Sequence, residues 1–152
     1  MYNRILVPID GSETSQVGLK EAIRIAGLTQ GRLRLIHVID ELSFALTVDA
    51  YSYHAGELLD LMRANGKKLL ESAQETVRAA GIEADYALYE NLDRTVQQRV
   101  LDEADAWKAD LIVIGTHGRR GARRLVLGSS AEGIMRGASV PVLLVRSPKG
   151  TS

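Results

Sequence analysis

The sequence contains no cysteine, and its formal net charge is zero because 19 basic side chains balance 19 acidic ones. The lack of cysteine excludes a disulfide scaffold and a metal site built from thiolates, and it suits a reducing compartment. The balanced charge provides no broad attraction to nucleic acid or to an acidic membrane. A single phenylalanine argues further against a stacking platform for nucleic acid.

Long apolar runs are also missing from the sequence. No stretch approaches the roughly 20 apolar residues that a membrane helix needs. The run at residues 5–9 is too short for a signal peptide, and Asp10 ends it. We therefore expect a cytoplasmic protein with no membrane partner. The 152 residues, 45% of them hydrophobic, fit one globular domain, expected at residues 1–147 and followed by a flexible tail at 148–152.

Short apolar runs alternate with segments of helical periodicity along the chain. The runs predict strands at residues 5–9, 33–39, 84–89, 111–114 and 140–145, of which 84–89 is the weakest and is expected at a sheet edge. Helical spacing predicts helices around residues 19–26, 58–80, 96–107 and 131–138. Gly81 is placed to end the long second helix, and Asn65-Gly66 marks where a kink or break would fall. Residues 41–53 show no period and are assigned to a loop.

Five strands that alternate with four helices predict an α/β fold. Such βαβ units form a parallel sheet covered by helices on both faces, here a three-layer sandwich in a single domain. Ligands of these folds bind beyond the carboxyl ends of the strands, where the winding reverses. Three strand ends stand out: residues 8–12 after the first strand, residues 37–40 at the second, and residues 115–130 after the fourth.

The stretch after the fourth strand has the features of a phosphate site. Gly115 and Gly118 leave a strand end without side-chain bulk, so backbone amides can approach a ligand closely. Gly128-Ser129 opens the next helix, whose free N–H groups and partial positive charge suit a phosphate. Four arginines lie between these glycines, at positions 119, 120, 123 and 124. The stretch is neither a Walker A loop nor a GxGxxG fingerprint.

The spacing Gly115-x-x-Gly118, nine residues, then Gly128-Ser129 resembles the nucleotide motif of the universal stress protein family. Residues 5–12, His37-Val38 and residues 141–145 are also similar to that family, so the resemblance covers essentially the whole chain. It implies the strand order 3-2-1-4-5 in a Rossmann-like fold of the adenine nucleotide alpha-hydrolase type. Members that keep this motif generally bind ATP, and the resemblance therefore implies ATP, ADP or AMP as ligand.

The resemblance also implies a role for each part of the cleft. The adenosine side would be lined by Pro8, Ile9, Asp10 and Val38. Within it, the Val38 backbone would meet adenine, and Asp10 would lie near the ribose or near a Mg²⁺ ion held by the phosphates. The pocket wall would continue through Ile114, Gly115, His117, Gly118 and Arg119. The phosphates would be held by Gly128, Ser129 and Ser130, although the family commonly has an apolar residue in place of Ser130. Members form homodimers through the last strand, here from Val142 to Val145.

Several of these residues also have an ordinary structural explanation. Ser129 and Glu132 have the spacing of a capping box, which needs no ligand. Asp10 is open between a ligand role, a cap on the first helix and a structural pair with a nearby base. His117 is open between a ligand contact and solvent. The arginines would clamp phosphate, form a solvated loop face or touch nucleic acid. Trp107 is expected in the core, and His37 is expected to be structural.

The resulting first hypothesis is an ATP-binding regulatory or stress-response module, homodimeric, with an unknown protein partner. The alternative is a slow ATPase or a phosphoryl- or nucleotidyl-transfer enzyme in the same cleft. Asp10 would then anchor a metal and the arginines would clamp charge, yet only His117 is available as a base. We therefore expect no catalytic residue, and turnover that is absent or slow. An interaction module with an empty cleft is the third hypothesis, against which the glycine spacing argues.

Overall fold

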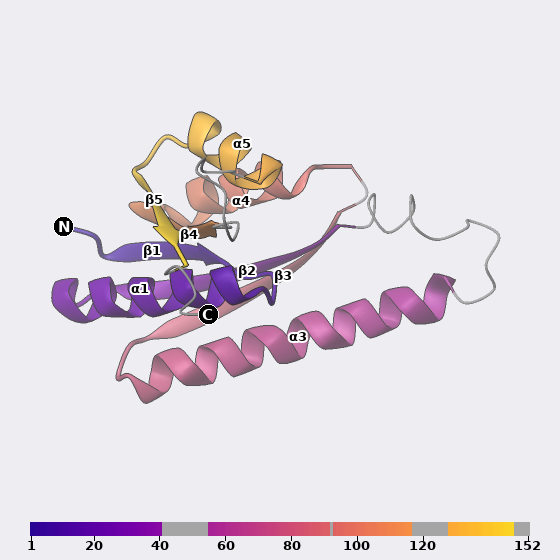
Figure 1. The fold of residues 1–152 in the computed structure, drawn as a ribbon, viewed down its shortest axis with the longest axis horizontal. Coiled ribbons are helices and arrows are strands. Elements are labelled where there is room, and N and C mark those ends of the chain that lie inside the picture. The colour runs from indigo at the N-terminus through magenta and orange to yellow at the C-terminus, as the bar shows by residue number, and fades with distance from the viewer. Residues whose placement is uncertain (41–54, 92, 117–127, 148–152) are drawn as a thin grey trace.

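A computed structural model describes residues 1–40, 55–91, 93–116 and 128–147 (Figure 1). Along the chain the elements are β1 (Arg4–Pro8), α1 (Glu13–Thr29), β2 (Arg32–Asp40), α3 (Ala55–Ala79), β3 (Ala84–Asn91), α4 (Val96–Trp107), β4 (Leu111–Thr116), α5 (Ser129–Gly137) and β5 (Val142–Arg146). The strands form one parallel sheet in the order β3-β2-β1-β4-β5. The predicted fold class, the strand order and the edge position of β3 are confirmed. The predictions for residues 41–53 and 148–152 lie outside the described residues.

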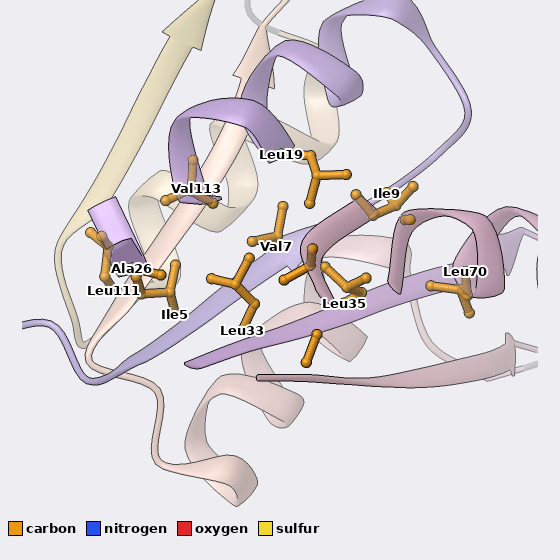
Figure 2. Packing of buried hydrophobic residues seen from close by; sticks show 14 residues of the cluster. Ile5, Val7, Ile9, Leu19, Ala26, Leu33, Leu35, Leu70, Leu111 and Val113 are labelled. Atoms are coloured by element: carbon orange, nitrogen blue, oxygen red, sulfur yellow. The ribbon is translucent and has the colours of Figure 1, made fainter. Parts of the chain in front are cut away.

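Helices cover both faces of the sheet, with α1 and α3 on one side and α4 and α5 on the other (Figure 1). Successive residues of a strand point to opposite faces, so Ile5 and Val7 join the core under α1 and α3 while Leu6 joins the other core. Figure 2 shows the first of these cores, to which β1 contributes Val7, β2 contributes Leu33 and Leu35, and β4 contributes Val113. Burial on both faces explains why β1 and β4 contain continuous apolar runs.

Local signals set the helix ends. The Ser12 hydroxyl accepts a hydrogen bond from Ser15 N at 3.2 Å and caps α1. Thr95 and Gln98 form a capping box at the start of α4. Gly81 has a φ of +78° just beyond α3, a left-handed conformation that glycine adopts without strain, so its predicted role as the stop is confirmed. None of the helices in the described ranges is long and apolar enough to cross a membrane.

The long helix α3 differs from its prediction in two respects. It is continuous, so Asn65-Gly66 introduces no break, and Gly66 is instead buried against the sheet. Leu58 and Leu61, predicted on the buried face, are 41% and 56% exposed. Only the second half of α3 packs into the core, through Leu70, Ala73 and Val77. The apolar spacing therefore continues into the first half of α3, where no described residue buries it.

An ion pair joins Arg34 of β2 to Glu103 of α4. The Glu103 side chain is only 6% exposed, and its Oε1 lies 2.5 Å from Arg34 Nε. This contact is an ion pair without the alignment of a hydrogen bond. The Tyr89 hydroxyl donates a hydrogen bond to Glu103 Oε2. Burial, reinforced by this carboxylate, raises the pKa of Tyr89.

Trp107 is half-buried rather than a full core residue. It packs against the second core, but its outer face carries cations. The guanidinium carbons of three arginines lie 5.6 to 5.9 Å from the ring centre: Arg4, Arg32 and Arg34. Stacking of a guanidinium on an indole is favourable, so the ring is an anchor between core and charged surface, which corrects the predicted role.

Candidate functional site

The carboxyl ends of three strands meet at the centre of one sheet edge. β1 lies between β2 and β4, while β3 and β5 lie outside them. The winding therefore reverses at β1, which is the topological switch point where ligands of open α/β sheets bind. Three groups of predicted site residues are brought together there: Pro8, Ile9 and Asp10 at the end of β1, Val38 near the end of β2, and Ile114 and Gly115 in β4.

The backbone of Val38 is directed toward the open end of β1. Arg32 N bonds to Asn3 O, and Ile36 O accepts from Ile9 N, so the even residues of β2 direct their peptide groups toward β1. Alternation extends this direction to Val38. The ladder between β1 and β2 ends at the pair Pro8–Ile36, whereas β2 stays paired with β3 up to Asp40. The Val38 N–H and C=O therefore face the site beyond the last β1 rung.

The turn after β1 is organised by Asp10. Its Oδ1 accepts hydrogen bonds from Ser12 N at 2.8 Å and from the Ser12 hydroxyl at 2.5 Å. Gly11, between them, has a φ of +84°, which other residues rarely adopt. Asp10 does not itself cap α1, because Ser12 does. The carboxylate is exposed, so it orders the turn while remaining at the mouth of the site.

His37 is structural, as predicted. Its Nδ1 lies 2.7 Å from Ile9 O, the carbonyl that precedes Asp10. Because a carbonyl only accepts, Nδ1 carries the proton in this contact.

Gly115 has a packing role that the sequence did not indicate. A Cβ there would lie 1.8 Å from Thr14 O and 2.4 Å from Thr14 C. Conversely, a Cβ on Gly18 would lie 2.8 Å from Gly115 N. The first turn of α1 thus rests directly on the end of β4. The space expected for a ligand at the Gly115 side-chain position is filled by Thr14 and its neighbours, and only the Gly115 backbone remains for the site.

The first turn of α1 is the part of the site region that sequence reasoning missed. Thr14 and Ser15 are buried polar residues, and the Ser15 hydroxyl donates to Ser12 O at 2.9 Å. A run of small hydroxyl residues after a strand end is a helix-start signal. That signal would have identified Ser12 as the cap.

The start of α5 carries no side-chain cap. The N-cap is Gly128, with φ −60° and ψ 150°, and Ser129 is the first helical residue. The predicted Ser129–Glu132 capping box is therefore wrong by one position. The Glu132 carboxylate instead pairs with Arg136 at 2.8 Å. First-turn amides that no side chain occupies are the groups that bind phosphate.

Gly128 is not required to be glycine by the backbone or by its described neighbours. Its φ is negative, it is exposed, and a Cβ there would have nothing within 4 Å. α5 leads into β5, whose first residue pairs with Ile112 in the first half of β4. The C-terminal end of α5 is therefore near the edge of the sheet where the strands begin. The N-terminus of α5 points to the opposite edge, where the strands end and the site lies. Ser129 is exposed and Ser130 is half-buried there.

Several predicted site residues follow β4 in the sequence. His117, Gly118, Arg119 and the other loop arginines lie outside the described residues. Within the described ranges, no group of three histidine or acidic side chains is arranged to hold a metal ion. The contact of Asp10 with a Mg²⁺ ion held by nucleotide phosphates stays a prediction.

The chain resembles known proteins over most of its length. The sequence profile described as "Universal stress protein family" matches residues 1–146. Universal stress protein MJ0531 of Methanocaldococcus jannaschii is 32% identical over 150 residues, which are 98% of this chain and 85% of that protein.

Solved structures show the same architecture. A universal stress protein family member from Burkholderia pseudomallei superposes with a TM-score of 0.78 at 31% identity, over 96% of this chain and 97% of that one. A universal stress protein from Archaeoglobus fulgidus, solved in complex with dAMP, superposes with a TM-score of 0.64 at 21% identity, over 94% and 97% of the two chains. The second likeness concerns the fold alone.

Proposed function

This chain belongs to the universal stress protein family, and from that premise we propose that it binds an adenine nucleotide at the carboxyl edge of its sheet. The uncapped N-terminus of α5 at Gly128 carries this proposal. A glycine there, with open space around its Cβ position, leaves room for a phosphate to approach the amides of residues 128–130. The dAMP complex of the Archaeoglobus fulgidus protein supports an adenine nucleotide as the class of ligand.

The adenosine end of the proposed site lies at β1 and β2. Val38 offers an N–H donor and a C=O acceptor beyond the last rung of the β1–β2 ladder. Adenine presents an acceptor and a donor side by side on its Watson–Crick edge, whereas guanine presents them in the opposite order. Backbone recognition by Val38 would therefore favour ATP over GTP. Asp10 would lie beside the ribose or a phosphate-bound Mg²⁺, next to Pro8 and Ile9.

The wall between the two ends is proposed to come from β4 and the stretch that follows it. Ile114 and the backbone of Gly115 would form its described part. His117, Gly118 and Arg119 would complete it toward the phosphates, with charge-assisted contacts from Arg119.

We propose binding without fast turnover. A general base must reach the attacking water, and His37, the described histidine next to the site, already donates to Ile9 O. A slow ATPase remains the alternative, with His117 as its candidate base. Phosphate release from Mg-ATP by wild type and by His117→Ala distinguishes the two, because turnover that depends on His117 would establish the enzyme.

The assembly is proposed to be a homodimer that pairs β5 with its symmetry mate. β5 is an outer strand of the sheet, and Val142, Leu143, Leu144 and Val145 are all half-buried in the single chain. An apolar edge strand is a template for pairing. Nucleotide binding would then stabilise a dimeric module that acts on an unidentified protein partner.

The decisive experiment is to denature the purified protein and identify any released nucleotide by chromatography and mass spectrometry. We expect near-stoichiometric ATP, ADP or AMP, or else a nucleotide-free protein whose Tm rises with Mg-ATP. At a ligand concentration of 100 Kd the stabilisation is about 2.7 kcal/mol. GTP at the same concentration should raise Tm less. No released nucleotide and no shift with Mg-ATP would disprove the binding proposal and favour the interaction module.

A further inference from the structure

The end of β1 is held by two hydrogen bonds from β2. Ile9 N donates to Ile36 O at 2.8 Å, and Ile9 O accepts from His37 Nδ1 at 2.7 Å. Both peptide groups of Ile9 are therefore fixed at the residue after the last ladder pair, Pro8–Ile36. The direction in which the chain leaves β1 toward Asp10 depends on the second bond, since the regular ladder has already ended.

Two successive turns of α3 pack against His37 and against the turn after β1. A Cβ on Gly66 would lie 2.8 Å from His37 Cδ2 and 3.1 Å from a methyl carbon of Leu88. A Cβ on Gly11 would lie 3.7 Å from a methyl carbon of Leu69. The His37 ring is thus confined between the Ile9 carbonyl and the α3 backbone, and Gly11 rests on the next turn of the same helix.

His37 also connects the two halves of the proposed adenosine side. It precedes Val38, whose peptide groups face the site, and it bonds to the carbonyl that precedes Asp10. From these contacts we infer that His37 is a positioning residue, which sets the spacing between the Val38 backbone and the Asp10 carboxylate. This inference rests on the proposed nucleotide site. In it, His37 touches no ligand and acts only through Ile9.

The test compares two substitutions at position 37. His37→Asn keeps an N–H donor the same number of bonds from Cα as Nδ1, whereas His37→Leu keeps bulk and loses the donor. We expect His37→Leu to raise the Kd for Mg-ATP about tenfold, as for loss of one well-placed hydrogen bond. His37→Asn should restore most of the affinity. Titration calorimetry supplies both Kd and the fraction of protein that binds.

A control variant separates positioning from general destabilisation. Val77→Ala removes buried methyl groups near the C-terminal end of α3. It should therefore lower Tm with no change in the Kd for Mg-ATP. Gly66→Ala provides a second approach if His37→Leu does not fold, because the added methyl group displaces the ring while its donor stays. It should raise Kd as His37→Leu does.

A second readout needs no nucleotide. Ser12 N donates to Asp10 Oδ1 at 2.8 Å, so its amide hydrogen exchange reports whether the turn is ordered. In nucleotide-free protein we expect His37→Leu to speed this exchange at least several-fold beyond the change in Val77→Ala. Wild-type protein that binds no nucleotide would refute the proposed function, while the Ser12 exchange would still test the positioning. A folded His37→Leu protein with wild-type Ser12 exchange and wild-type Kd would overturn the inference.

Discussion

The carbonyl oxygen of Thr14, in the first turn of α1, lies 1.8 Å from the position that a Cβ on Gly115 would take in β4. No side chain fits at position 115, because Thr14 O already occupies this space. Thr14 O belongs to the backbone of the first turn of α1, which Ser12 caps. We expect Gly115→Ala to destabilise the protein by about 1–3 kcal/mol or more, as overpacking does. Denaturant unfolding in the absence of nucleotide measures the loss.

The matched control is Gly27→Ala in the same helix α1. Its Cβ would meet only a methyl carbon of Ile82, at 3.9 Å, an ordinary contact. Alanine is the better helix former, so Gly27→Ala should stabilise by about 0.5–1 kcal/mol. A Gly115→Ala protein as stable as wild type would show that the α1–β4 contact is looser than described. Packing would then not explain the glycine at position 115, and only its proposed role in the ligand site would remain.

Position 128 allows helix stability and nucleotide affinity to be moved in opposite directions. Gly128→Asp introduces a favourable N-cap at an exposed position with extended φ and ψ, so the nucleotide-free protein should gain some tenths of a kcal/mol. The same carboxylate would occupy the first-turn amides of α5 and repel phosphate. The Kd for Mg-ATP should therefore rise at least about tenfold. Thermal unfolding and calorimetry on one preparation give both quantities.

Gly128→Ser is the control because it supplies a cap without charge. It should stabilise the free protein in the same way and weaken Mg-ATP binding much less than Gly128→Asp does. If Gly128→Asp is more stable and still binds Mg-ATP with wild-type Kd, the α5 N-terminus is not the phosphate site.

Much of the fold was predictable because burial on both faces leaves continuous apolar runs. The runs at β1 and β4 gave their strands to within a few residues, although the order of the strands came only from the resemblance to the family. Helix boundaries were less secure, since Gly128 and Ser129 are both acceptable N-caps and the choice depends on a one-residue shift. That shift distinguishes a helix capped by its own serine from a helix without a side-chain cap, which is the form that the phosphate proposal needs.

Packing between distant segments could not be predicted from local pattern. Gly115 and Gly66 both looked like local features, a ligand wall and a helix weakness. Each also accommodates a partner far away in sequence, Thr14 and His37 respectively. The exposed Leu58 and Leu61 were misassigned for the related reason that periodicity identifies a face but not what covers it.

Tyr89 should make the stability of the protein fall at alkaline pH. The ordinary pKa of tyrosine is 10.0, and burial, followed by the hydrogen bond to Glu103, raises the pKa of Tyr89 in the folded state. The unfolded chain therefore loses this proton first as pH increases. Stability from protonated Tyr89 is complete below pH 10.0 and is lost as pH rises from there through the folded-state pKa.

Tyr89→Phe removes this titration. The variant should be less stable than wild type at neutral pH, by about 1 kcal/mol for a partly exposed hydrogen bond. Above pH 10 its stability should decline less steeply than that of wild type. Urea unfolding between pH 8 and pH 11 follows the difference, and parallel curves for the two proteins would show that Tyr89 ionises alike in both states.

The proposed homodimer predicts that a charge on β5 separates the subunits. β5 pairs with β4 on one side, and its apolar residues are half-buried in the single chain. A lysine ammonium on the apolar face of a sheet continued through two such strands would lose hydration with no partner, and inward charges are a known means of blocking edge pairing. We expect Leu143→Lys to convert a dimer into a monomer at micromolar concentration, measured by sedimentation velocity.

Leu28→Lys is the control, since Leu28 lies on α1 and is 78% exposed. It should leave the sedimentation coefficient unchanged, which separates a specific effect at β5 from the effect of one added charge. Leu143 also packs partly against the core under α1 and α3, so circular dichroism must show that Leu143→Lys is folded before its mass is interpreted. A folded Leu143→Lys dimer would place the contact elsewhere, and a monomeric wild type would contradict the proposed assembly altogether. In either case nucleotide binding would stand, because every residue proposed to hold the ligand belongs to one chain.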